Sequence, residues 1–275
     1  GAIKSSSTNL SIAPLLIKNN GADVTNCAVF GEISVTNGAG RIGGLVAEHL
    51  SGKVSNCWTD VKITVTNGRF NIGGIIGNMG STKEAYLTTS FASGNIKVVG
   101  GKNSLIGGLV GKVTGVTSGT SSAKIDSCYF SGLTKHSSKN TIFEIANENY
   151  YGAFVGSVGD ASDKELTIDK FGITNSYFAG KLGNSDNYYN NAYTKVMVGY
   201  YSGSVQTSKL NPYFNTVYIS SLQTVAWSDY LAHSVTAGYL KDLTSANIGY
   251  NYNFISGYRP TLAEVTPADR MDNYS

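Results

Sequence analysis

Short apolar runs separated by turn residues recur through most of the chain. Between residues 54 and 76 they lie at 54–58, 61–65 and 72–76. The middle run, Val-Lys-Ile-Thr-Val, alternates apolar and polar residues with the period of a half-buried strand. The Asn-Gly pair at 67–68 then indicates a turn, because both residues tolerate a positive φ. The pattern predicts three short strands in about 30 residues, with no long amphipathic helix.

This pattern is an internal repeat. Residues 54–76 overlay residues 24–46 at a shift of 30 with no gap, and the identical positions include Val-Thr-Asn-Gly at 35–38 and Ile-Gly-Gly at 42–44. A repeat this regular predicts a stack of similar units, in which each unit buries its apolar face on its neighbours.

Two short motifs define the unit. The first is a branched residue, two polar residues, a small Cys or Ser, and then often an aromatic; it begins at Val24, Val54, Leu87, Ile125 and Ile173, with a degenerate copy at Leu210. The second is Ile-Gly-Gly-Leu-Val-Gly, which begins at Ile42, Ile72 and Ile106 and persists in altered form at Tyr151 and Thr194. Three strands and three corners in about 30 residues predict one coil of a parallel β-helix. The expected fold is therefore all-β, a β-solenoid of about six coils.

Stacked coils explain several residue choices. The Gly-Gly pairs at 43–44, 73–74 and 107–108 are expected where backbones approach closely. An amide ladder is expected along the stack, and it would contain Asn26, Asn56 and Asn175.

The three cysteines occupy one repeated position. Cys27, Cys57 and Cys128 fall where Ser90 and Ser176 stand in other units, so we expect free thiols packed as small apolar groups. A Cys27–Cys57 disulfide stays open as an alternative. No Cys-x-x-Cys spacing is present, so no metal site or cofactor is expected.

The repeat fades after about residue 220. We therefore expect a solenoid over 1–220 and a C-terminal capping segment over 221–275, because an open solenoid end exposes strand edges and core. Ile3 falls 30 residues before Ile33, so the chain opens in the middle of a unit. Further sequence or domains upstream are expected, and the alternative is that the first unit is a natural partial cap.

Composition narrows the class of protein. Charged residues are only 14% of the chain, net charge is +3, and Ser, Thr, Asn and 18 Tyr are abundant. A neutral exterior rich in hydroxyls and amides is typical of secreted repeat proteins. The absence of a basic stripe makes nucleic acid a poor partner, and no apolar run has the length of a membrane-spanning segment.

The alternation of Ile-Gly-Gly-Leu-Val-Gly with Val-Ser-Asn-Cys-Trp resembles the GLUG repeat of bacterial cell-surface proteins. The resemblance covers roughly residues 1–215 and is weakest at 194–199, where both central glycines are lost. It implies an extracellular β-solenoid from an adhesin-like protein or from the non-catalytic part of a secreted enzyme. Some IgA-cleaving metalloproteases carry such repeats, but their His-Glu-x-x-His zinc motif is absent around His49, His136 and His233, so protease activity is not expected.

Other chemistry has weak support. Glu144, Glu148 and Asp186 lie in enlarged loops of successive units and are the candidates for a carbohydrate-active β-helix enzyme. The acidic segment 160–165 loosely resembles a calcium loop without its ordered ligand pattern. No spacing distinguishes either group from solvated loop charges.

Tyrosines give the sharper hypothesis. Loops 133–150 and 183–193 are enlarged at the same relative position and should be spatial neighbours. They carry the candidate ligand-binding residues, namely Tyr150, Tyr151, Tyr188, Tyr189 and Tyr193. Tyr rings with neighbouring amides suit sugars and protein surfaces alike. The alternative is that these rings pack their own loops onto the coil.

The aromatic residues of the first motif, at 129–130 and 177–178, are expected to be core or stack residues instead. Together these features predict a non-catalytic surface protein that acts in cell adhesion or binds a host glycan or extracellular protein. The alternatives are a passive spacer in a larger secreted protein and a carbohydrate-active enzyme.

Overall fold

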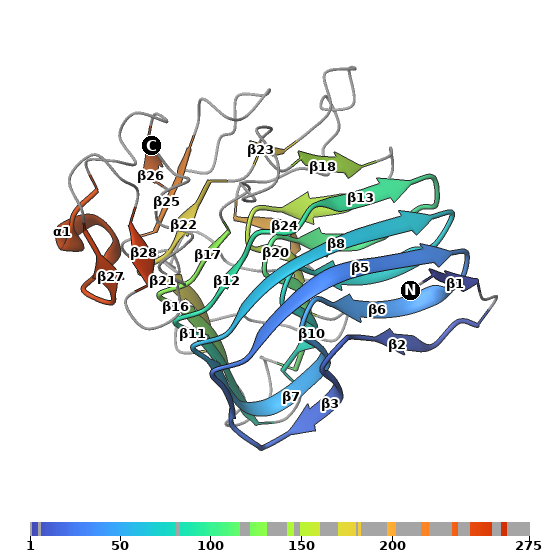
Figure 1. The fold of residues 1–275 in the computed structure, drawn as a ribbon, viewed down its shortest axis with the longest axis horizontal. Helices are drawn as coiled ribbons and strands as arrows, with labels where there is room; N and C mark the ends of the chain where they lie inside the picture. The colour runs from blue at the N-terminus through green and yellow to red at the C-terminus, as the bar shows by residue number, and fades with distance from the viewer. Residues whose placement is uncertain are drawn as a thin grey trace.

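The computed structural model shows an all-β chain with parallel sheets, as the sequence predicts (Figure 1). It describes residues 2–4, 7–80, 83–115, 122–130, 142–145, 149–159, 170–179, 181–182, 197–201, 216–219, 233–235, 243–254 and 260–262. One short helix, α1 (Ser245–Ile248), lies within these ranges. None of the described residues forms a helix with the length and apolar character needed to cross a membrane.

The largest sheet has 11 strands among the described residues, and its pairings are parallel. Its members are β1 (Ala2–Lys4), β5 (Ala28–Thr36), β8 (Trp58–Thr66), β12 (Phe91–Ala92), β13 (Ile96–Val99), β17 (Tyr129–Phe130), β18 (Ile142–Ile145), β22 (Tyr177–Phe178), β23 (Lys181–Leu182), β25 (Val217–Ile219) and β26 (His233–Val235). The long strand β8 pairs with β12 through its first residues and with β13 through its last.

Two further parallel sheets complete each unit. The 10-stranded sheet contains β3 (Leu16–Asn20), β4 (Val24–Thr25), β7 (Val46–Ser55), β10 (Ile76–Met79), β11 (Glu84–Thr88), β15 (Val110–Val113), β16 (Ser122–Asp126), β20 (Val155–Val158), β21 (Phe171–Thr174) and β24 (Val198–Tyr201). The 5-stranded sheet contains β2 (Leu10–Ile12), β6 (Ala39–Gly43), β9 (Arg69–Gly73), β14 (Leu105–Gly107) and β19 (Tyr150–Gly152). A two-stranded antiparallel sheet joins β27 (Tyr252–Asn253) to β28 (Thr261–Leu262).

Strand register follows the sequence repeat. Ile42 lies beside Ile72, Ile72 beside Ile106, and Ile106 beside Tyr151, so copies of the second motif are direct neighbours. Residues 28–36 pair one to one with residues 58–66. The predicted equivalence of the units is therefore confirmed in the pairing of their strands.

The core lies between the three sheets and is built from rows of equivalent residues. Ile42, Ile72 and Ile106 are fully buried, and so are Leu45, Ile75 and Leu109 beside them. Each unit contributes the same apolar positions, which lie next to their copies one unit away. The core is consequently continuous along the stack.

The repeated cysteine position is inward, as expected. Cys57, Cys128, Ser90 and Ser176 are all fully buried, and the three cysteines are free. The backbone N–H of Cys57 donates to Ser90 Oγ at 3.1 Å, so the serine also hydrogen-bonds to the neighbouring unit. Burial raises the pKa of the Cys57 thiol to about 11, which makes it an unreactive packing group. The alternative of a Cys27–Cys57 disulfide is wrong.

Positive-φ residues mark two corners of the unit. At the Asn-Gly turn Asn37 and Asn67 have φ of 63° and 56°. The predicted amide row also has positive φ at Asn26, Asn56 and Asn175, but Thr89 and Ser127 interrupt it. Thr89 Oγ1 hydrogen-bonds to Asn56 Oδ1. This row is mixed rather than a pure amide ladder, and what its members share is the left-handed backbone.

Described residues near the C-terminus pack on the outer side of the large sheet. β25 and β26 pair across the proposed boundary at residue 220, so the large sheet continues beyond it. The described residues of 243–262 then lie along the side of the sheets, where Figure 1 places α1, β27 and β28 in red beside β16, β21 and β22. Tyr252 packs its ring on Tyr129 and Tyr177 and donates its hydroxyl to Asn175 O at 2.9 Å. This segment covers a lateral face.

A buried histidine joins three successive units. His49 is fully buried, and its Nδ1 accepts a hydrogen bond from Asn19 Nδ2 at 3.1 Å. Its Nε2–H donates to Gly52 O at 3.1 Å and Tyr86 O at 3.2 Å. Burial favours the neutral ring and lowers the pKa of His49 to about 4.

His49 should make stability depend on pH. Because its folded pKa of about 4 lies below the ordinary 6.5, the unfolded chain binds the proton first as pH falls. The free energy of unfolding should fall between pH 6.5 and 4, by about 3 kcal/mol at the limit. Urea unfolding of wild type and His49→Gln at several pH values measures this. The variant should lack that part of the pH dependence, and parallel profiles for the two proteins would contradict it.

Candidate functional site

The glycine pairs form a corner whose tip points into the core. A Cβ on Gly43 would lie 1.9 Å from Val46 O, and one on Gly44 would lie 2.0 Å from Gly74 O in the next unit. Only glycine fits such approaches of backbone to backbone. The next residue, Leu45, is fully buried. The strands that enter and leave this corner are its two arms. Because the corner itself is buried, side chains that point away from the core on the two arms face each other.

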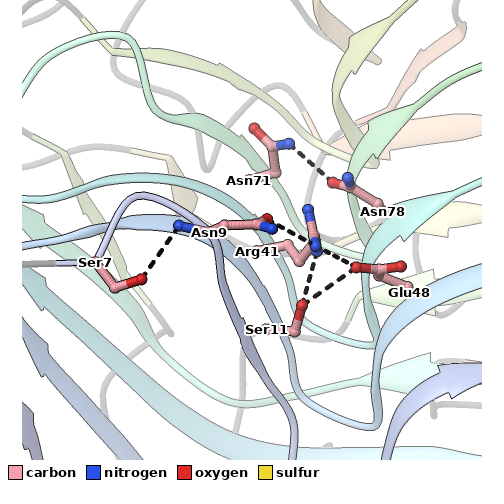
Figure 2. A network of polar contacts seen from close by, with 7 residues as sticks. All are labelled: Ser7, Asn9, Ser11, Arg41, Glu48, Asn71 and Asn78. Carbon is pink, nitrogen blue, oxygen red and sulfur yellow. Dashed lines mark hydrogen bonds and ion pairs between the residues drawn. The ribbon is translucent and has the colours of Figure 1, made fainter. Parts of the chain in front are cut away.

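Arg41 and Glu48 face each other in this way, seven residues apart (Figure 2). They form an ion pair, and both side chains are mostly buried, at 22% and 16% exposed. Arg41 Nε donates to Ser11 Oγ at 2.8 Å, and Ser11 Oγ–H donates to Glu48 Oε1 at 3.2 Å. Arg41 Nη2 also donates to Asn9 Oδ1 at 3.0 Å. The network joins both arms of one corner to the preceding unit.

The next unit replaces the ion pair with an amide pair. Asn71 lies beside Arg41 in the 5-stranded sheet, and Asn78 lies beside Glu48 in the 10-stranded sheet. Asn71 Nδ2 donates to Asn78 Oδ1 at 2.8 Å, as Figure 2 shows. Beside Asn78, a Cβ on Gly77 would lie 2.7 Å from Ala47 O and 3.0 Å from Ile42 N, so its backbone lies close to both arms of the preceding unit.

Farther along the stack the row of Asn71 becomes apolar and then aromatic, whereas the row of Asn78 stays polar as far as Ser157. Leu105 and Lys112 follow the amide pair, and Tyr150 and Ser157 follow them. Tyr200 continues the second row, and its ring lies 4.8 Å from that of Tyr150 with the planes tilted by 48°. We call these two rows the corner face; it comprises Ser11, Arg41, Asn71, Leu105 and Tyr150, and opposite them Lys18, Glu48, Asn78, Lys112, Ser157 and Tyr200.

The structure separates the two candidate tyrosines that it describes. Tyr150 is partly exposed on the corner face. Tyr151 is only 5% exposed and belongs to the core, where it lies beside Ile106, so it cannot present its ring to a ligand. For Tyr151 the packing alternative therefore applies. The other candidates, Tyr188, Tyr189 and Tyr193, lie outside the described residues.

The residues considered for catalysis and calcium lie mostly outside the described ranges, including Glu148, Asp186 and the segment 160–165. Glu144 is in β18, beside Lys97 in the backbone register. In the part of the chain that the structure describes, no three His, Cys, Asp or Glu side chains come together as a group that could hold a metal ion.

Of the residues predicted from the sequence to bind a ligand, Tyr150 lies on the corner face; the sequence prediction did not include the other residues of this face. These residues directly precede or follow a copy of the second motif: 41 and 48 flank 42–47, 71 and 78 flank 72–77, and Tyr200 follows 194–199. The available signal was their constant spacing of seven residues around the glycines. A spacing of seven residues indicates a contact between two side chains only when the two strands that flank the corner are known to lie close together.

A scan against protein-family models, a search of the curated proteins and a search of the solved structures each gave no match. The GLUG resemblance accordingly stays a prediction from the motifs.

The Arg41–Glu48 pair should be replaceable by the amide pair of the next unit. Arg41→Asn or Glu48→Asn alone leaves a mostly buried charge without its counter-ion and should lower the free energy of unfolding by about 1 kcal/mol. The double variant restores a neutral hydrogen-bonded pair and should recover most of that loss. Urea unfolding of the four proteins tests this coupling. Strictly additive losses would show that the two side chains act independently.

Proposed function

We propose that this chain is a β-solenoid of about six coils, and that it acts as a non-catalytic ligand-recognition or adhesion module of a bacterial surface protein. The fold part rests on the register, in which each strand of a unit pairs in parallel with its copy in the next unit in three sheets. The extracellular setting rests on the motif resemblance and on the low content of charged residues, 14%.

The observation that carries the recognition role is the Tyr150–Tyr200 pair on the corner face. Tyr200 is 41% exposed, and its ring leans against Tyr150 at the end of rows that also hold Lys112, Ser157 and the amide pair. Tyr rings offer rigid contact area with a hydroxyl at the tip, and amides and hydroxyls supply hydrogen bonds in both directions. Sugars and protein surfaces are both recognised by this combination.

The geometry of the rows favours an extended ligand. Equivalent side chains repeat along the stack at the strand spacing of about 4.8 Å, so the corner face presents the same two positions in successive coils. A linear glycan or an extended peptide lying along the stack would contact the amide pair, Lys112 and the tyrosines in turn. A compact ligand would contact only one coil.

Binding should depend on the two tyrosines. We would measure binding of the chain to an array of host glycans, mucins and matrix proteins, with wild type beside the double variant Tyr150→Ala/Tyr200→Ala. The variant should bind at least tenfold more weakly, which corresponds to about 1.4 kcal/mol. Tyr250→Ala is the matched control, because Tyr250 is 87% exposed and is not part of the corner face.

Folding must be verified in the same experiment, since Tyr150 is only partly exposed. Tyr150→Phe keeps the ring and removes only the hydroxyl, so its thermal midpoint and its binding, measured together, separate the contribution of the hydroxyl to folding from its contribution to ligand binding. Folded wild type that binds nothing on the array would favour a passive spacer. Binding that is unchanged in the folded double variant would exclude the corner face.

A further inference from the structure

A column of four aromatic rings runs along the outside of the large sheet. Trp58 and Phe91 have ring centroids 5.8 Å apart, Phe91 and Tyr129 4.6 Å, and Tyr129 and Tyr177 4.8 Å. Adjacent planes differ by no more than 6°. The rings come from equivalent positions on neighbouring strands, so each unit adds one ring to the column.

The C-terminal segment covers the last three rings of this column and leaves the first, Trp58, partly exposed. Phe91, Tyr129 and Tyr177 are at most 1% exposed. They pack in one apolar cluster with C-terminal residues, namely Leu243, Ile248, Tyr252 and Leu262. The hydroxyl of Tyr177 donates to Pro260 O at 2.6 Å and helps hold that segment in place. Trp58, the first ring, remains partly exposed.

The column ends at Trp58 because the next residue in the row is small. Ala28 lies beside Trp58 on the side opposite Phe91, and it is exposed. A methyl group there stands where the series would place another ring. A flat group lying over Ala28 would therefore continue the column at ordinary stacking distance from the indole.

Apolar and polar groups lie next to this position. Phe30 is two residues beyond Ala28 on the same strand and is 75% exposed. Asp60 lies beside Phe30 on the neighbouring strand. Two residues farther on, Glu32 and Lys62 form an exposed ion pair at 3.5 Å.

This combination matches a sugar ring better than an aromatic side chain of a protein partner. A pyranose has a flat face of C–H groups that stacks on an indole and a rim of hydroxyls that both donate and accept hydrogen bonds. Carboxylates accept from such hydroxyls, and an ammonium group donates to them. An aromatic side chain would use the indole but leave the polar neighbours without hydrogen bonds from the ligand.

We propose that Trp58, Ala28 and Phe30 form a carbohydrate-stacking site, which binds one pyranose ring of a neutral glycan as the next member of the aromatic column. The site lies on the large sheet, whereas the corner face belongs to the two other sheets, so the site does not depend on the role proposed for the corner face.

Trp58 can report on its own occupancy. The chain has two tryptophans, and Trp227→Phe leaves Trp58 as the single indole fluorophore. Cellohexaose, chitohexaose, maltohexaose and mannohexaose would each be titrated into this protein. At least one should produce a saturable change in Trp58 emission, because a sugar ring that stacks on the indole alters its solvation. No saturable change with any of the four overturns the proposal.

Two variants locate the binding. Ala28→Trp places an indole in the proposed sugar position; it should weaken binding at least tenfold and should not lower the thermal midpoint, because the new ring extends the column. Phe30→Ala removes an exposed side wall and should weaken binding by roughly threefold without a loss of stability. Because the added indole also fluoresces, binding to Ala28→Trp is measured by isothermal titration calorimetry beside the parent protein, and undiminished binding to the folded variant would overturn the proposal.

The corner-face variant separates this site from the proposed function. Tyr150→Ala/Tyr200→Ala in the Trp227→Phe background should retain the full Trp58 response. Glycan binding on the array that leaves Trp58 emission unchanged would overturn the stacking site and leave the corner face standing. A Trp58 response that the corner-face variant keeps supports the stacking site, even where the array shows no role for the corner face.

Discussion

The close approach of backbones at the paired glycines is the constraint on which the rest of the structure depends. Parallel pairing fixes neighbouring units at one strand spacing, and at the second motif a Cβ added to Gly44 or Gly74 would lie only about 2 Å from the next carbonyl oxygen. Only glycine permits that distance in the three copies that carry the Gly-Gly pair, at 43–44, 73–74 and 107–108. The tip of each corner is thereby held in the core, and the two arms that leave it must run close together.

At this constant spacing, equivalent residues of successive units lie side by side and form a row. The burial of a row and its neighbours determine which residue types occur in it. The row that starts at Ile42 is enclosed and stays apolar, whereas the row that starts at Cys27 accepts only small side chains. The corner-face rows are partly exposed and face a partner across the corner. They change from an ion pair to an amide pair and then to Leu and Tyr, because any complementary or compatible pair fits there.

The C-terminal segment does not take part in this repeat, and its contacts are with residues far away in the sequence. Tyr252 and Asn251 reach units more than a hundred residues earlier in the chain, where Asn251 Nδ2 donates to Ser127 Oγ at 2.7 Å. What it covers is an outer aromatic column, which would otherwise be a large exposed apolar patch. The stack therefore has one side closed by its own chain and keeps Trp58 partly exposed at the margin of that cover.

The β class and the strand register follow from the sequence alone, because a repeat with a period of 30 states which residues are neighbours in a parallel stack. The sequence also placed Tyr150, but it could not distinguish it from Tyr151, since adjacent residues of a strand point to opposite sides and the repeat does not say which side is the core. The same ambiguity applies to Tyr129 and Phe130: both were expected to be core or stack residues, and the second packs in the core while the first packs under the C-terminal segment. Tertiary structure alone decided the corner face and the lateral cover. The corner face depends on how the chain folds back across a sharp corner, and the C-terminal contacts join residues more than a hundred positions apart. The local pattern of apolar and polar residues does not state which residues meet in either case.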